Sequence, residues 1–141
     1  MATWVVDASV ILKWLLADPV REPDTRLASA LMESIADGRH EIIQPPHWLA
    51  EVAAVLARLS PATAEDDVAM LRAMEWPVCD EVTVWARACR MAIDTRQHLF
   101  DTLYHATALE SASATLVTAD KRYMSAAGAT GRIMPLRDCV L

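Results

Sequence analysis

Short runs of apolar and β-branched residues alternate along the chain with longer segments whose apolar positions recur every three or four residues. Runs of the first kind are typical of buried strands, and the second spacing is typical of helices with one buried face. The pattern predicts short strands at residues 3–6, 42–43, 76–79, 115–118 and 132–134. It predicts helices at residues 9–17, 23–37, 46–59, 63–74, 82–95, 100–111 and 121–127.

Capping and helix-breaking residues mark the ends of several predicted helices. Ser9 suits the N-cap of the first helix, Asp18-Pro19 breaks it, and Pro45-Pro46 opens the third helix. Because the strands are apolar without alternation, they predict a parallel sheet with helices on both faces. We therefore expect one α/β domain over residues 1–141, with a three-layer α/β/α fold and a central, mainly parallel sheet of about five strands.

The composition excludes several classes of protein. Cys79, Cys89 and Cys139 are far apart, which argues against structural zinc and a disulfide framework and suits the reducing cytoplasm. No apolar run approaches the roughly 18 residues of a membrane span, and the N-terminus lacks the basic region of a signal peptide. With three glycines, the chain has no material for phosphate-binding or dinucleotide-binding loops. We expect a cytoplasmic protein with no membrane partner.

Two aspartates directly follow predicted strands. Asp7 comes after the strand at 3–6, and Asp120 comes after the strand at 115–118. Ligands of parallel α/β sheets sit beyond the carboxyl ends of the strands, where these two acids are expected to lie close together. Aspartate is also a favoured helix N-cap, so each position has a purely structural interpretation as well.

Two further acids lie on predicted helices. Glu51 shares a polar stripe with His47 on the helix at 46–59, which is also the pattern of a solvated helix face. Asp101 lies in the first turn of its helix, where a negative charge is favourable without any function. His105 falls one turn later on the same face, and we expect it to have a structural role.

Taken together, the four acids predict a specific chemistry. Hard divalent cations such as Mg²⁺ bind oxygen ligands, and three or four carboxylates in one pocket can hold one or two such ions. The ions orient a phosphodiester, activate a water molecule and neutralise charge on the leaving oxygen. This chemistry requires no cysteine and no conventional protein nucleophile.

Four segments carry a family resemblance. They are residues 5–9 (VVDAS), 48–52 (WLAEV), 100–104 (FDTLY) and 116–120 (LVTAD), in that order. Together they resemble the PIN domain, in particular the VapC-type toxins of bacterial toxin–antitoxin pairs, and the likeness runs from Val5 to about Leu136. It implies that residues 1–141 form a single PIN domain and act as a metal-dependent endoribonuclease.

The resemblance also implies the site and its partners. The acidic site maps onto Asp7, Glu51, Asp101 and Asp120, which are expected to bind Mg²⁺ or Mn²⁺, Glu51 directly or through water. Ser9 and Thr118 match polar family positions beside the metal. The family pattern more often has an apolar residue where this chain has His105. The implied partners are an RNA substrate, a second copy of the chain and a small antitoxin protein that covers the site.

Basic side chains near the acids are candidate phosphate contacts. Lys121 and Arg122 immediately follow Asp120, and Lys13 lies on the helix after Asp7. The alternative is that they are ordinary solvated helix charges. Three methionines on predicted helices, Met32, Met70 and Met74, suit close helix packing or a groove for an antitoxin helix.

Other functions remain open at this point. One is a PIN fold that binds RNA or protein without catalysis, with its acids serving as caps. Another is a nuclease that cuts DNA, because the same metal chemistry cleaves both backbones. Aspartate-based phosphatases and response-regulator receivers fit less well, because position 9 is serine and no acidic pair has the receiver spacing.

The four acids also weaken the argument that the negative net charge excludes a polyanionic partner such as RNA. Without them the formal charge of −6, from 19 acidic and 13 basic side chains, becomes −2. Much of the acidity that argues against a polyanion partner is then the proposed metal site itself. We expect weak non-specific affinity for RNA and binding concentrated at the metal-loaded cleft.

Overall fold

The centre of the fold is a parallel four-stranded sheet. The computed structural model describes residues 1–16 and 24–141. The strands are β1 (Thr3–Val6), β2 (Glu41–Ile42), β3 (Ala114–Thr118) and β4 (Ile133–Pro135), in the order β2-β1-β3-β4. All three neighbouring pairs are parallel. The α/β fold class with a parallel central sheet is therefore confirmed.

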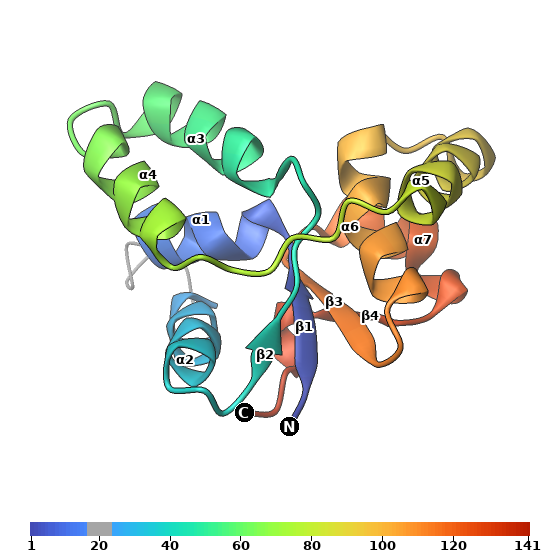
Figure 1. Ribbon diagram of the computed structural model, residues 1–141, viewed down its shortest axis with the longest axis horizontal. Helices are drawn as coiled ribbons and strands as arrows, with labels where there is room; N and C mark the ends of the chain where they lie inside the picture. Colours follow the sequence, from blue (N-terminus) through green and yellow to red (C-terminus); the bar gives the residue numbers. More distant parts are fainter. Residues whose placement is uncertain (17–23) are drawn as a thin grey trace.

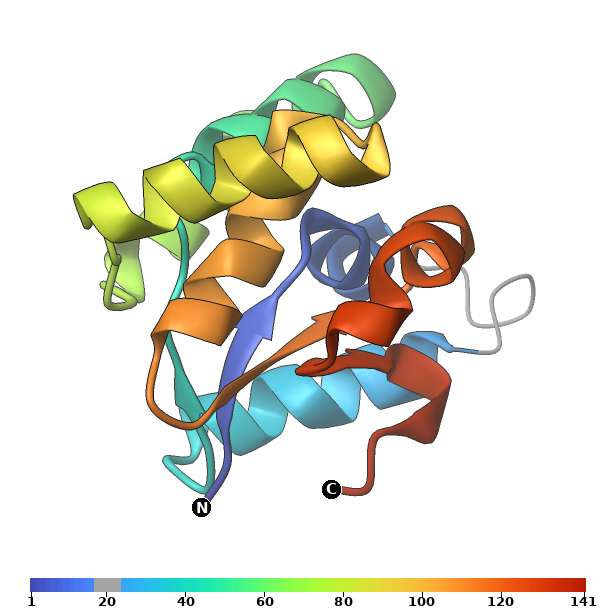
Figure 2. The same ribbon diagram turned by 90° about the vertical axis from the view of Figure 1, so that its right-hand side faces the viewer.

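Helices cover both faces of this sheet and give the three-layer arrangement. The elements are α1 (Ala8–Leu16), α2 (Thr25–Ala36), α3 (Trp48–Leu59), α4 (Ala64–Ala73), α5 (Val82–Thr95), α6 (Leu99–Glu110), α7 (Lys121–Ala127) and the short 3₁₀ helices Gly128–Thr130 and Leu136–Asp138. In Figure 2, α6 lies above the sheet and α2 lies below it. Figure 1 shows that α3 and α4 form an arm beside α1, apart from α5 and α6.

The strand predicted at residues 76–79 is reduced to a single parallel bridge between Val78 and Gln44. The sheet therefore has four strands rather than about five. Pro77 has no N–H and contributes only its carbonyl, which accepts from the N–H of Gln44, while the N–H of Cys79 donates to the carbonyl of Gln44. Since proline also stands on the other side at Pro45, the ladder cannot lengthen in either direction.

Most predicted helix boundaries lie within two residues of those in the structure. The predicted break at Asp18-Pro19 and the predicted helix start at Pro23 lie outside the described residues. Within residues 1–16 and 24–141, no helix is both long enough and apolar enough to cross a bilayer.

The core lies where β1 and β3 meet the helices. Val5 and Val6 of β1 and Val117 of β3 have no exposed surface, as expected for strands covered on both faces. Apolar burial stabilises this centre and fixes the register in which Val6 is level with Val117. The ends of β1 and β3 are thereby held next to each other.

Gln44 completes the end of β1 with its side chain. The amide is fully buried, its Nε2 donates to the Val6 carbonyl at 2.9 Å, and its Oε1 accepts from the Val6 N–H at 2.9 Å. Backbone groups of the neighbouring strand would otherwise supply these two bonds. The side chain therefore extends the sheet edge by one residue and fixes the backbone immediately before Asp7.

We predict that Gln44→Leu lowers the free energy of unfolding by about 2–4 kcal/mol, because the Val6 N–H and carbonyl lose their partners in a buried position. The matched control is Gln97→Leu, since the half-buried Gln97 makes one longer bond, 3.2 Å, to the Thr95 carbonyl. Urea denaturation of both variants measures the difference. Equal losses in the two variants would contradict this role for Gln44.

Candidate active site

The carboxyl ends of β1 and β3 bring two acids to one edge of the sheet. Asp7 directly follows β1, and its N–H donates to the Val117 carbonyl of β3 at 3.0 Å. Asp120 follows β3 by two residues. Because the two strands are parallel neighbours, both acids lie at the edge where ligands of such sheets bind.

Asp7 combines a capping role with a free carboxylate oxygen. Its Oδ2 accepts from the backbone N–H of Ser9 at 3.0 Å and from the Ser9 hydroxyl, so Asp7 caps α1. The expectation that Ser9 is the N-cap is wrong, because α1 already begins at Ala8. Within the described residues, Asp7 Oδ1 makes no hydrogen bond and stays available to a ligand.

Ser9 and Thr118 hold the loops that carry the two aspartates. The Ser9 hydroxyl donates to Asp7 and accepts from the N–H of Ala119 at 3.0 Å, which joins the two strand ends. The Thr118 hydroxyl is buried and accepts from the N–H of Asp120 at 3.0 Å. Asp120 in turn caps α7, since its Oδ1 accepts from the N–H of Tyr123 at 3.0 Å.

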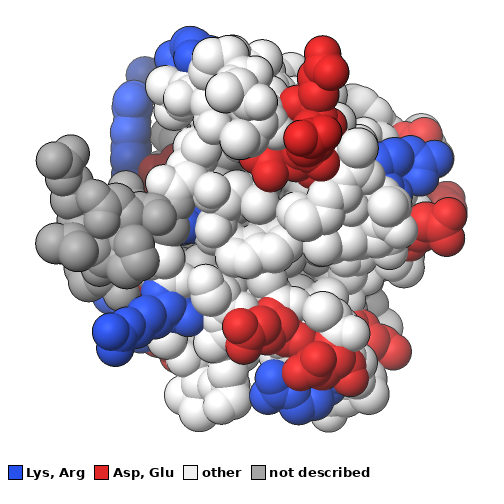
Figure 3. Space-filling model, turned by 90° about the vertical axis from the view of Figure 1, so that its left-hand side faces the viewer, with Lys and Arg blue, Asp and Glu red and all other residues white. Residues whose placement is uncertain are grey.

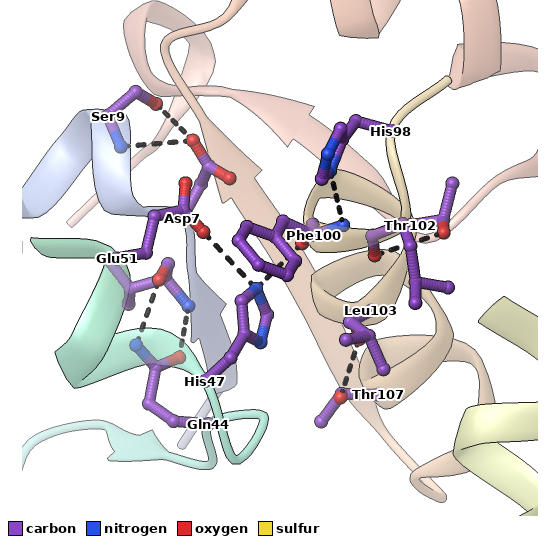
Figure 4. Close-up of polar contacts among 12 residues, drawn as sticks. Asp7, Ser9, Gln44, His47, Glu51, His98, Phe100, Thr102, Leu103 and Thr107 are labelled. Carbon is purple, nitrogen blue, oxygen red and sulfur yellow. Dashed lines mark hydrogen bonds and ion pairs between the residues drawn. The ribbon is translucent and has the colours of Figure 1, made fainter. Parts of the chain in front are cut away.

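Glu51 and Asp101 approach the same edge from two helices. Glu51 lies in the first turn of α3 and Asp101 in the first turn of α6. The side chain of Glu51 is 24% exposed, so it is not the solvated helix charge that its stripe would also allow. Figure 4 shows the side chains of Asp7, Glu51 and His47 directed toward one another.

The acids act on one another electrostatically. The pKa of Asp7 is raised to about 6, mainly by burial and to a smaller extent by the charges of Glu51 and Asp101, against the opposing effect of the two Ser9 hydrogen bonds. Burial also raises the pKa of Asp101, and the charges of Glu51 and Asp120 add to that rise. Each of the four acids predicted from the sequence therefore interacts electrostatically with at least one of the others.

Two buried tyrosines line this acidic region. Burial raises the pKa of Tyr104 well above its ordinary value, and the charges of Asp7 and Glu51 add to the rise. Burial likewise raises the pKa of Tyr123, followed by the charges of Asp101 and Asp7. Both phenols stay protonated, so neither adds to the negative charge of the site.

Several buried polar atoms of the site lack a hydrogen bond. Among the described residues, the unpartnered buried side-chain atoms include His47 Nδ1, Glu51 Oε2 and Tyr104 Oη. Buried polar groups in proteins are nearly always satisfied, so a cluster of exceptions indicates a place where a ligand or ion completes the bonding. Of these three, His47 and Tyr104 were not predicted as site residues, although His47 stands four residues before Glu51 on the predicted polar stripe.

The acids do not form a closed ligand set as they stand. In the described part of the chain, no three His, Cys, Asp or Glu side chains are grouped so as to hold a metal ion. The donor chemistry nevertheless suits a hard divalent cation: the oxygens are carboxylates, and Asp7 Oδ1 and Glu51 Oε2 carry no hydrogen bond. Repulsion between the acids favours the entry of a cation, around which the side chains would close.

His105 has the structural role expected of it. The side chain is fully buried, with Nε2 2.7 Å from the Gly131 carbonyl and Nδ1 2.9 Å from the Tyr123 hydroxyl. Because a carbonyl can only accept, Nε2 carries the proton and Nδ1 accepts from Tyr123. Burial lowers the pKa of His105, which keeps the ring neutral. His105 thus accepts the hydrogen bond of the Tyr123 hydroxyl.

The predicted basic contacts differ in their surroundings. Lys121 and Arg122 are exposed at the start of α7, and Lys13 is half-buried on α1. Lys121 lines a pocket of about 270 Å³ together with Thr118, Asp120, Ser125 and Arg137. The pocket therefore adjoins the acidic site through Thr118 and Asp120 and carries two cationic side chains.

Comparison with protein families adds to this geometry. Residues 4–129 match the model of the PIN domain. The chain belongs to the PIN-domain family. All four acids lie within the matched region, and PIN domains are generally nucleases, which gives the chain a nuclease fold. A search of curated proteins finds no match.

The raised pKa of Asp7 predicts an unusual stability profile for this PIN domain. Ionised Asp7 destabilises the native state as the pH rises through the interval from 3.8 to about 6, because the folded protein holds the proton more tightly than the unfolded chain. A shift of this size corresponds to an upper limit of about 3 kcal/mol. Without metal, Asp7→Asn should therefore be more stable than the parent at pH 8 by about 1–3 kcal/mol and equally stable near pH 4.

Urea denaturation in EDTA at pH 4, 6 and 8 measures this difference. The control is Asp94→Asn, because Asp94 is exposed on α5. An Asp7→Asn variant that is less stable than the parent at pH 8 would show that the ionised carboxylate stabilises the metal-free fold.

Proposed function

We propose that this chain is a Mg²⁺- or Mn²⁺-dependent endoribonuclease and the toxin of a toxin–antitoxin pair. The observation that carries the proposal is the convergence of Asp7, Glu51, Asp101 and Asp120 from four elements at the ligand-binding edge of a PIN-domain sheet. Their mutual effects on pKa support a single site. A purely capping role would not require Glu51, which caps nothing and is directed toward Asp7.

The proposed metal ligands are the four carboxylates, with Glu51 binding directly or through water. A bound divalent ion lowers the pKa of a water molecule and neutralises charge on phosphate oxygens. Asp7 must be ionised to bind it, so affinity should fall as the pH drops below about 6. Ser9 and Thr118 hold the two aspartates in place through the bonds described above. The buried rings of Tyr104 and Tyr123 exclude water from the inner side of the site.

Substitution of each acid tests the proposal. Asp7→Asn, Glu51→Gln, Asp101→Asn and Asp120→Asn should each lower RNA cleavage about a hundredfold, the scale expected when one electrostatic stabilising group is lost. Cleavage of a mixed RNA pool with Mn²⁺, with and without chelator, measures the effect. The control is Glu65→Gln, since Glu65 is an exposed acid in the first turn of α4, as Glu51 is in α3.

Three outcomes separate the alternatives. Full activity of an amide variant removes that residue from the site. Mn²⁺ binding by the parent without any cleavage favours a catalytically silent binding module. Equal cleavage of single-stranded DNA favours a nuclease of broader specificity.

The pocket beside Asp120 supports a role for basic side chains in binding RNA. Lys121 lines it, and Arg122 is exposed next in sequence. If both side chains contact phosphate, the double variant Lys121→Gln/Arg122→Gln should bind RNA more weakly and lower the slope of log affinity against log salt by about 1–2. Fluorescence anisotropy at several salt concentrations gives the slope. The control is Arg58→Gln/Arg72→Gln on the α3–α4 arm, and an unchanged slope would remove Lys121 and Arg122 from the RNA-binding surface.

An apolar groove supports the proposed antitoxin partner. It has a volume of about 800 Å³ and lies between α2, β2 and the segment after α4, lined by Trp14, Met32, Met74 and Trp76 among others. Of the three methionines predicted to suit close helix packing or such a groove, Met32 and Met74 line the groove and Met70 does not. Figure 3 looks onto the side of α2 and α4, which is largely uncharged at its centre and bordered by separate acidic and basic side chains.

A second exposed apolar surface suits the proposed homodimer. Val82, Trp85 and Ile93 are spaced along one side of α5 and are 78%, 37% and 76% exposed. The opposite side of α5 packs on α6 through Val84, Ala88 and other buried residues. A second copy of the chain would cover the exposed side.

A further inference from the structure

We propose that His47 is a positioning residue of the acidic site, which holds Glu51 in place against the first turn of α6. This inference rests on the proposed function, because it concerns how two of the proposed ligands are set relative to each other. His47 immediately precedes α3 and stands one helical turn before Glu51. Its side chain is 11% exposed, so the ring is part of the interior rather than of the surface.

The geometry of the ring fixes its proton. His47 Nε2 lies 2.8 Å from the carbonyl oxygen of Phe100 and 3.2 Å from Oε2 of Glu51 (Figure 4). A carbonyl can only accept, so the proton must be on Nε2 and directed to Phe100. The Glu51 carboxylate, whose Oε2 lies 3.2 Å from the same nitrogen, then interacts with this N–H electrostatically. Glu51 Oε2 accepts no hydrogen bond from it.

This arrangement joins the start of α3 to the first turn of α6. His47 makes one hydrogen bond and two ring contacts between the start of α3 and α6. Its ring centroid lies 5.1 Å from that of Phe100 and 4.7 Å from that of Tyr104. Since α3 and α4 form an arm apart from α5 and α6 (Figure 1), the His47 side chain sets how far the arm stands from α6.

The consequence reaches both proposed ligands. Glu51 is on the arm, and Asp101 directly follows the residue whose carbonyl accepts from His47. A change at His47 would therefore alter the separation of Glu51 and Asp101, although His47 itself is not a proposed ligand. Because the His47 proton is given to Phe100, Glu51 Oε2 remains available to a cation.

Two substitutions separate the N–H donor from the packing of the ring. His47→Phe keeps an aromatic ring and removes the donor, and His47→Gln restores an N–H at similar reach. The control is His40→Phe, since His40 lies at the opposite end of β1 and accepts from the N–H of Ala2 at 3.2 Å. Binding of Mn²⁺ is measured by calorimetry, and thermal denaturation without metal confirms that each variant is folded.

We expect His47→Phe to weaken Mn²⁺ binding about tenfold, the lower end of the range for residues that orient metal ligands. His47→Gln should recover most of that loss, and His40→Phe should bind like the parent. If His47→Phe binds Mn²⁺ within twofold of the parent, or if His47→Gln binds no better than His47→Phe, the inference is overturned. If the parent binds no Mn²⁺ and cleaves no RNA, the proposed function fails first.

A measurement on the parent protein covers the case in which His47→Phe does not fold. Nitrogen-15 spectra of the histidine rings are recorded while Mg²⁺ is added, and the signals are assigned by comparison with His47→Gln. A protonated Nε2 on His47 and a larger shift for His47 than for His40 are expected. A His47 signal that does not respond while backbone signals of Glu51 and Asp101 shift would overturn the inference.

Discussion

The carboxylate of Asp7 has to remain at the buried end of β1, and the rest of the site is arranged around that constraint. The residue is 8% exposed, and its pKa is raised to about 6 by burial and by the neighbouring acids. Removing a charge from water is costly unless it is paired or hydrogen-bonded. Ser9 supplies two hydrogen bonds to the Asp7 carboxylate. A divalent cation would offset the part of the cost of burying this charge that the two bonds leave.

The fold resolves a conflict that is general to acidic sites. Strand-to-helix turns favour aspartate as a cap, and a metal site needs the same carboxylates to face a ligand. Asp7 and Asp120 meet both requirements by using one oxygen for the cap and leaving the other without a hydrogen bond in the described residues. Local helix stability thereby fixes the orientation of the group that the proposed chemistry uses.

The site is also assembled from parts that differ in how firmly they are held. Asp7 and Asp120 follow neighbouring core strands, whose register is set by buried valines. Glu51 instead comes from the α3–α4 arm, and His47 lies 3.2 Å from its Oε2 and 2.8 Å from the Phe100 carbonyl of α6. A site of this kind can close around a cation by small movements of one side while the strand ends stay fixed.

The sequence by itself determined the α/β class and most helix and strand positions, because apolar spacing and capping preferences are local properties. It also singled out the four acids, whose role as one metal site stays a prediction. It did not determine that residues 76–79 contribute one bridge, since that depends on Pro77 facing Gln44. The roles of Gln44 and His47, and the hydrogen-bond partners of His105, were decided only by the tertiary structure. Each of these side chains bonds to a backbone group 26 or more residues away in the sequence, as with Gln44 and Val6, which are 38 residues apart. No periodicity in a sequence encodes such a distance.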